Sequence, residues 1–278
     1  MRYLCFIPVV LIAMFLAAYA HAQFLGGVPL PFASKASSSG PTGNSLIFTA
    51  ASSQSLSKTG NASANQQKLT ISTWFKQTTT GASKAYYSAG DGTTNNRFLV
   101  EIENTNVILI LGSVSGSTVL NLITNATYTD TTSWHHLLVG VDTTQATSSN
   151  RVSLYVDGTA VSSFSTSTFP SLNANLATNN TGTQYISNNN TTGSGLYLND
   201  KLAQYYYIDG QNLTPSSFIT GTPGVPKTYT GTYTGSFDFF LPFSNGTSTT
   251  TLGLDSSGEA NNWTLNNMTT ANQSTDFP

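Results

Sequence analysis

Two glutamates, Glu101 and Glu103, are the only carboxylates in the sequence with the spacing of a glycoside-cleaving strand. Alternate residues of a strand share one face, so the two carboxyl groups would project side by side. Retaining hydrolysis needs an acid and a nucleophile about 5 to 5.5 Å apart. The acidic row ends there, because Asn104 follows. We interpret the pair as exposed glutamates on a polar strand face and expect no catalytic residues; a glycoside hydrolase or lyase is the remote alternative.

The histidines offer little more chemistry. His135 and His136 are adjacent, and the third, His21, lies in an apolar N-terminal stretch. Neighbouring residues of a strand point to opposite faces, so His135 and His136 are badly placed to share a metal ion or form a dyad. We expect both to be packing residues.

An oxygen-rich, glycine-containing segment at residues 255–262 has the hard ligands that Ca²⁺ prefers. Its candidate ligands are Asp255, Ser257, Asn261 and Asn262. Residues 91–96 form a second polar loop of this kind. We expect a structural turn and no cofactor here, and a structural calcium ion is the alternative interpretation.

A non-catalytic sugar site combines aromatic rings with neutral hydrogen-bonding groups, and the chain is rich in both. The candidate ligand-binding residues are Tyr86, Asn95, Asn96, Tyr197, Tyr205 and Tyr207. The competing interpretation is that alternate tyrosines of a strand pack into a sheet core and that asparagine runs form turns.

Strands must position all these residues. Residues 133–142 and 151–156 alternate apolar and polar side chains, and Asp157-Gly158 suits a two-residue hairpin turn before a return strand at 160–164. We also predict a strand pair within 45–56, a short helical turn at 213–218, and no long helix. Further strands are predicted at 68–76, 85–88, 98–103, 107–111, 119–123, 184–187, 195–209 and 237–243. The pattern indicates an antiparallel sandwich or barrel.

Composition narrows the class of function. Only 8% of residues are charged, against roughly 25% in ordinary soluble proteins, and the formal net charge is −2. No basic surface for nucleic acid is expected. Arg2, an apolar run over 3–19 and Ala-His-Ala at 20–22 predict a signal peptide at residues 1–22. We expect export, without stable membrane insertion after cleavage.

Four segments, taken in order, give the chain a likeness to a known family. They are residues 69–76, 133–142, 152–158 and 201–210. Together they resemble the laminin-G-like, concanavalin A-like lectin/glucanase superfamily. The resemblance implies an all-β, antiparallel jelly-roll β-sandwich of two curved sheets, and it implies a structural turn at the Asp255 loop.

A narrower resemblance involves residues 142–152, 208–218, 226–233 and 253–263. These segments look like laminin-G-like structural proteins of marine phages and environmental viruses, which implies a virion, tail or host-recognition component. The export signal departs from that pattern and favours a secreted or surface-displayed relative.

The sequence thus predicts a signal peptide (1–22), a flexible leader (23–44), one laminin-G-like sandwich (45–265) and a frayed polar tail (266–278). The expected function is non-catalytic extracellular recognition of a glycan or a cell-surface or particle protein. The alternative is a virion or fibre subunit that assembles, as a homo-oligomer, through its own edges.

Overall fold

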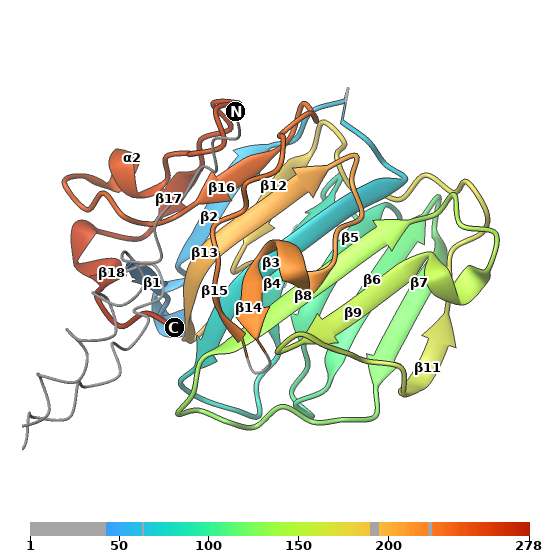
Figure 1. Cartoon of the computed structure of the whole chain (residues 1–278), viewed down its shortest axis with the longest axis horizontal. Coiled ribbons are helices and arrows are strands. Elements are labelled where there is room, and N and C mark those ends of the chain that lie inside the picture. Colours follow the sequence, from blue (N-terminus) through green and yellow to red (C-terminus); the bar gives the residue numbers. More distant parts are fainter. Residues whose placement is uncertain (1–42, 63, 190–194, 222–223) are drawn as a thin grey trace, which may run out of the picture. The chain divides into compact units, whose positions relative to one another are not determined.

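The computed structural model describes residues 43–62, 64–189, 195–221 and 224–278 (Figure 1). Every described residue belongs to one compact unit. The predicted signal peptide and nearly all of the predicted leader lie outside the described residues. Among the described helices, none is long and apolar enough to cross a membrane.

Two eight-stranded antiparallel sheets make up the described fold, which confirms the predicted jelly-roll sandwich. Sheet A contains β1 (Ser45–Ile47), β3 (Lys68–Gln77), β8 (His135–Asp142), β9 (Val152–Val156), β10 (Thr159–Ala160), β13 (Asp200–Asp209), β16 (Phe239–Leu241) and β18 (Gln273–Ser274). Sheet B contains β2 (Ser55–Thr59), β4 (Lys84–Gly90), β5 (Arg97–Ile102), β6 (Ile108–Val114), β7 (Ser117–Thr124), β11 (Phe164–Thr168), β12 (Thr183–Ile186) and β17 (Thr264–Asn266).

Short elements complete the chain. A small hairpin is formed by β14 (Ile219–Gly221) and β15 (Gly224–Pro226). The helical pieces are η1 (Ala50–Ser52), η2 (Ser148–Asn150), η3 (Pro215–Ser217), α2 (Thr249–Leu252) and η4 (Thr270–Asn272). The predicted helical turn with proline at its start is therefore confirmed.

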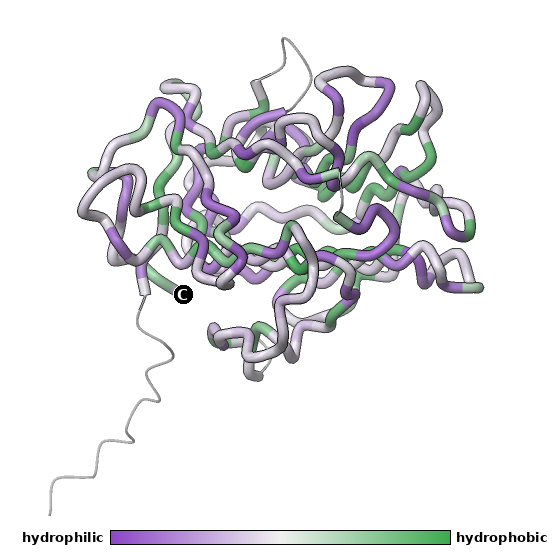
Figure 2. Tube along the Cα trace, turned by 90° about the horizontal axis from the view of Figure 1, so that it is seen from above, coloured by the Kyte–Doolittle hydropathy of each residue, from purple (hydrophilic) through white to green (hydrophobic). Residues whose placement is uncertain are grey.

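The main core lies between the sheets. In β5 it takes Phe98, Val100 and Ile102, which alternate with Leu99 and Glu101 on the opposite face of the strand. Leu99 and Glu101 are buried as well. Figure 2 shows the sandwich from above, with hydrophobic segments along both layers.

A second apolar cluster lies on the outer face of sheet A. Its buried members include Trp74, Leu138 and Tyr206, and Phe218 packs on them from the segment after β13 with ring centroids of Tyr206 and Phe218 5.1 Å apart. Sheet A is therefore covered on both faces, which explains why β13 is buried along almost its whole length.

Turn chemistry agrees closely with the sequence. Asp157 and Gly158 have φ of 51° and 78°, the left-handed conformation of a type I′ turn, and they join β9 to β10. The return strand is shorter than predicted, because β10 ends at Ala160 and the chain then crosses to sheet B as β11.

Two sequence-based expectations were wrong. Residues 45–56 do not form a strand pair, since β1 joins sheet A and β2 joins sheet B. Residues 266–278 are not a frayed tail either, because β17 pairs with β2 and β18 pairs with β1. Long-range pairing decided both points, and short polar strands give no pattern that local periodicity can detect.

Candidate ligand-binding sites

A cavity of about 300 Å³, the loop pocket, opens at one end of the sandwich. It is built by the loops that follow β2, β4 and β11, together with the end of β6. Its lining is Gln66, Asp91, Asn96, Val114, Asn175, Leu176, Ala177 and Asn180. One carboxylate and four side-chain amides thus converge beside three apolar side chains.

Hydrogen bonds between backbone groups hold these loops together. Asp91 N–H donates to the Asn96 carbonyl at 3.1 Å, and Leu176 N–H donates to the Gln66 carbonyl at 3.0 Å. Gly116 N–H donates to the Asn95 carbonyl at 3.0 Å, which ties the β6–β7 turn to the β4–β5 loop. The pocket is therefore preformed.

Asp91 is the charged group of the loop pocket. Its Oδ1 accepts hydrogen bonds from Thr93 Oγ1 at 2.6 Å and Thr93 N–H at 2.9 Å, and its Oδ2 accepts one from Asn96 Nδ2 at 2.8 Å. These bonds lower the pKa of Asp91, and the bond from the Thr93 hydroxyl has the largest effect. Asn96 Oδ1 in turn accepts from Ser115 N–H at 2.9 Å. The carboxylate is ionised, exposed and retains acceptor capacity at Oδ2.

The structure disperses the six residues that the sequence analysis selected as ligand-binding. Asn96 lines the loop pocket, and exposed Asn95 lies in the same loop. Tyr197 is half-buried in the segment before β13 and does not line the pocket. Gln66, Asn175 and Asn180 were missed, because only the fold brings their distant loops to residues 91–96.

Tyr86, Tyr205 and Tyr207 do not form a surface site but pack in the core, as the competing interpretation of these candidates expected. All three are core residues with 0–1% exposure. Register shifts at Ala85/Tyr87 in β4 and at Ala203/Tyr206 in β13 accompany their inward packing. Their hydroxyls are satisfied internally by Asp200, by the Tyr86 carbonyl and by Asn179.

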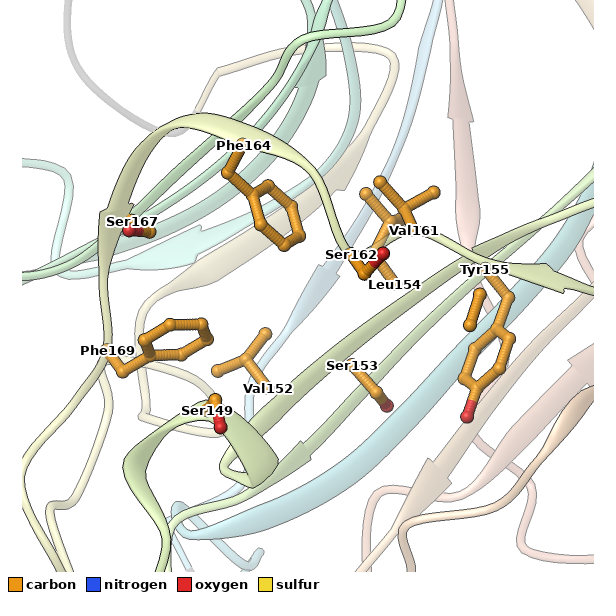
Figure 3. Close-up of a pocket in the computed structure, with 11 residues that line it drawn as sticks. Ser149, Val152, Ser153, Leu154, Tyr155, Val161, Ser162, Phe164, Ser167 and Phe169 are labelled. Atoms are coloured by element: carbon orange, nitrogen blue, oxygen red, sulfur yellow. The ribbon is translucent and has the colours of Figure 1, made fainter.

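A larger cavity of about 430 Å³, the edge pocket, lies between β9 and β11, where the two sheets end (Figure 3). Phe164 and Phe169 face into it opposite Val152. The full lining is Ser149, Val152, Ser153, Leu154, Tyr155, Ala160, Val161, Ser162, Phe164, Ser167 and Phe169. Since these residues carry no charge, the edge pocket suits an uncharged, partly apolar group.

The Asp255 loop does not fit a calcium ion. Asp255 Oδ1 accepts from Phe240 N–H at 2.9 Å and Ser257 N–H at 2.8 Å, and Oδ2 accepts from Ser257 Oγ at 2.7 Å and Asn261 N–H at 2.9 Å. Four donors therefore occupy the lone pairs that a cation would need. Asn262 Oδ1 accepts from Asp255 N–H at 2.9 Å. The arrangement is a structural turn, as the family resemblance implied.

Of the candidate catalytic groups, Glu101 and His136 are buried, and His135 lies within hydrogen-bond distance of Asp157. Glu101 is only 6% exposed, which corrects the expectation of an exposed pair, and burial raises its pKa. His136 is fully buried beside Ser72, with Nε2 2.8 Å from Ser72 Oγ, and burial lowers its pKa to about 4. His135 lies on the opposite face of the strand, with Nδ1 2.7 Å from Asp157 Oδ2.

Comparison with known proteins identifies a family. A family model described as the concanavalin A-like lectin/glucanases superfamily matches residues 50–205, more than half of the chain. A search of curated proteins gave no match.

Three of the solved structures to which this chain is similar are distant from it in sequence. A heptameric SAP-like pentraxin from Limulus polyphemus is 13% identical, with a TM-score of 0.42, over 62% of this chain and 78% of that one. A Bacteroides ovatus protein described as carbohydrate-binding is 13% identical, with a TM-score of 0.49, over 81% and 58% of the two chains. Domains LG4-5 of the mouse laminin α1 chain are 10% identical, with a TM-score of 0.44, over 73% and 49%. These likenesses concern the fold alone.

Proposed function

Because the chain belongs to the concanavalin A-like lectin/glucanases superfamily, we propose that it is a non-catalytic protein that binds a neutral saccharide in the loop pocket. The observation that carries this proposal is the convergence of Asp91 with four side-chain amides in one preformed cavity. Sugar hydroxyls both donate and accept hydrogen bonds, and amides together with a carboxylate satisfy both roles.

In this proposal, each part of the pocket has a role. Asp91 accepts from adjacent hydroxyls at its exposed Oδ2, and the Asn96 amide, oriented by Ser115 and Asp91, fixes the direction of that carboxylate. Val114 and Leu176 offer apolar surface to the C–H face of a ring. A volume of about 300 Å³ is at the small end of ligand pockets, which suits one sugar residue held with little movement of the loops.

The test uses the full chain on a glycan array, followed by calorimetry with the best neutral ligand. Asp91→Asn should weaken binding about 10- to 100-fold, because a hydrogen bond to a charged group contributes about 1.5 to 3 kcal/mol. Asp130→Asn removes the same charge at a carboxylate outside the loop pocket and should bind normally. Equal affinity of Asp91→Asn and the unaltered chain would contradict the proposal.

We also propose that the protein has no hydrolase or lyase activity. The support is the burial of Glu101, which removes it from contact with a polymeric substrate. Incubation with laminarin and alginate should release no oligosaccharides. Turnover that disappears in Glu101→Gln would overturn this point.

The predicted signal peptide supports a secreted or cell-surface location as part of the proposal. A second candidate function is assembly into a fibre, particle or virion. It is favoured by β11, one of the two edge strands of sheet B, which has an uncharged sequence, Phe-Ser-Thr-Ser-Thr, beside the edge pocket. Uncharged edges are templates for pairing with another copy. A silent glycan array combined with oligomers that are lost in Ser167→Lys would favour assembly over glycan binding.

A further inference from the structure

Three side chains form a row across the outer face of sheet A, away from both pockets. Lys201 in β13 and Lys76 in β3 are directly paired across the two strands. Phe75 pairs with His135, so Trp134 continues the row beside Lys76 on the next strand. Their neighbours Phe75 and Leu202 belong to the core between the sheets, which places Lys76 and Lys201 on the opposite face. We name this row the basic cradle.

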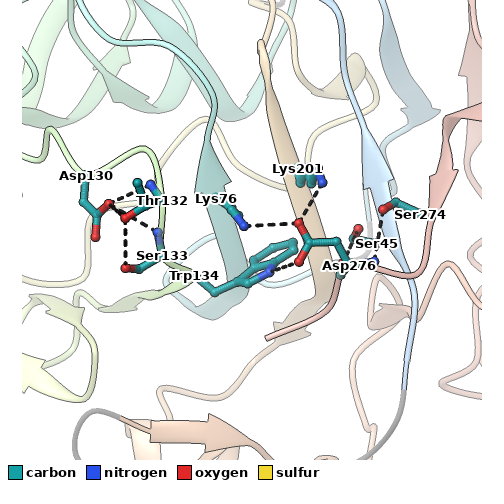
Figure 4. A network of polar contacts seen from close by, with 9 residues as sticks. All are labelled: Ser45, Lys76, Asp130, Thr132, Ser133, Trp134, Lys201, Ser274 and Asp276. Atoms are coloured by element: carbon teal, nitrogen blue, oxygen red, sulfur yellow. Dashed lines mark hydrogen bonds and ion pairs between the residues drawn. The ribbon is translucent and has the colours of Figure 1, made fainter.

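Two ammonium groups directly opposite each other repel unless an anion lies between them. In the basic cradle that anion is the carboxylate of Asp276 (Figure 4). Its Oδ2 lies 2.7 Å from Lys201 Nζ and 3.2 Å from Lys76 Nζ, and its Oδ1 accepts from Trp134 Nε1 at 3.0 Å. Partial burial opposes ionisation, but the bonds from Lys201, Trp134 and Lys76 lower the pKa of Asp276 to about 2. Both oxygens of a carboxylate are thus recognised.

Outside the basic cradle, residues 273–278 are held by β18, by side-chain hydrogen bonds and by one aromatic ring. Gln273 Nε2 donates to the Phe243 carbonyl at 2.7 Å. Strand β18 pairs with β1 through two residues only, Gln273 and Ser274. Ser45 Oγ donates to the Asp276 carbonyl at 2.7 Å, and Phe277 packs at the margin of the outer apolar cluster. The Asp276 side chain is 33% exposed, and the Lys76 and Lys201 side chains are 23% and 21% exposed. The cradle is therefore close to solvent, and a competing anion can reach it.

We propose that the basic cradle is a binding site for the carboxylate of an acidic sugar, such as a uronate, and that Asp276 occupies it in the ligand-free chain. The ligand carboxylate replaces that of Asp276 between the two lysines and the indole N–H. Half-buried Trp134 then lies against the attached sugar ring, where an aromatic side chain contributes apolar contact. Residues 273–278 act as a built-in competitor of this second site, which is independent of the loop pocket.

The experiment measures binding of tetragalacturonate to the full chain by calorimetry in about 0.15 M salt, which screens distant charges. Asp276→Asn should raise the affinity about tenfold, because apparent affinity scales with the fraction of chains in which the site is open. Glu259→Gln, which changes the net charge equally at an exposed position, should have no such effect. Adding Lys76→Gln and Lys201→Gln to Asp276→Asn should abolish the gain. Maltotetraose, a neutral tetrasaccharide, and sodium sulfate serve as ligand controls, and neither should bind Asp276→Asn more tightly than the unaltered chain.

A second measurement needs no variant. Hydrogen exchange of peptides that cover residues 273–278 should become faster when tetragalacturonate is added to the unaltered chain, because the ligand displaces the segment. A merely structural role of Asp276 predicts a lower melting temperature in Asp276→Asn with unchanged affinity and unchanged exchange, and that result overturns the proposal. An equal gain in Glu259→Gln, or an equal gain for sulfate, would reduce the effect to general electrostatics and also overturn it. Loss of neutral-sugar binding in Asp91→Asn bears on the loop pocket alone.

Discussion

A buried ion pair that links the two sheets gives the sharpest prediction about stability. Lys84 at the start of β4 and Asp200 at the start of β13 are 1% and 0% exposed, with Nζ 2.8 Å from Oδ1. Tyr86 OH donates to Asp200 Oδ2 at 2.6 Å, and Lys84 Nζ also donates to Gln77 Oε1 at 3.2 Å. Every charge in this network is satisfied, and each depends on its partner.

Replacement of Asp200 by Asn removes one charge and leaves the Lys84 ammonium buried without a counterion. Breaking a buried pair from one side lowers the free energy of unfolding by about 3 to 5 kcal/mol. Removal of both charges is far milder, because the desolvation of two ions disappears together with their attraction. In Lys84→Met/Asp200→Asn the amide oxygen can still accept from Tyr86. We expect this double variant to be more stable than Asp200→Asn by about 2 kcal/mol or more.

Urea unfolding followed by tryptophan fluorescence measures these differences. The midpoints should fall in the order wild type, double variant, Asp200→Asn, with similar m-values for all three chains. Lys84→Met alone is the matched control, because it leaves an unpaired carboxylate and should be as damaging as Asp200→Asn. A loss below about 1 kcal/mol in Asp200→Asn, or additive losses in the double variant, would refute the reasoning.

Two further predictions concern pH. Hydrogen bonding to Asp157 raises the pKa of His135, so the contribution of His135 to stability is complete below the unfolded pKa near 6.5 and is lost as pH rises through the folded pKa. His135→Gln should therefore reduce the dependence of the melting temperature on pH between pH 6 and 8.5, and an unchanged dependence would contradict this. Burial raises the pKa of Asp238 from 3.8 to about 6, so its contribution is present below pH 3.8 and disappears as pH rises to about 6. In Asp238→Asn the melting temperature should no longer fall between pH 4 and 6.5 for this reason, whereas a fall equal to that of the wild type would argue against it.

Much of the fold was predictable from local patterns. Strands β3, β8 and β9 follow the alternation of their side chains, and the Asp157-Gly158 turn follows from the tolerance of both residues for positive φ. These features depend on neighbours in the sequence, so the sequence alone shows them. The opposite orientation of His135 and His136 was predictable for the same reason.

The candidate sites were much less predictable. Tyr86 looks like any strand tyrosine, and only the central place of β4 in sheet B and its bulge turned the ring into the core. Asn96 was selected from its loop, but its partners Asn175 and Asn180 lie about eighty residues later. No periodicity relates side chains so far apart.

The sequence by itself determined the class of the protein: short alternating strands, few charges and turn residues at regular intervals permit little other than an antiparallel sandwich. Tertiary structure decided which polar residues meet. Asp276 reaches Lys76 and Lys201 only because β18 pairs with β1, which itself pairs with β13. Strand order in a sheet is set by the burial of the whole apolar face, which is a property of all the strands together. The strand order in turn determines which loops, and therefore which polar side chains, lie next to each other.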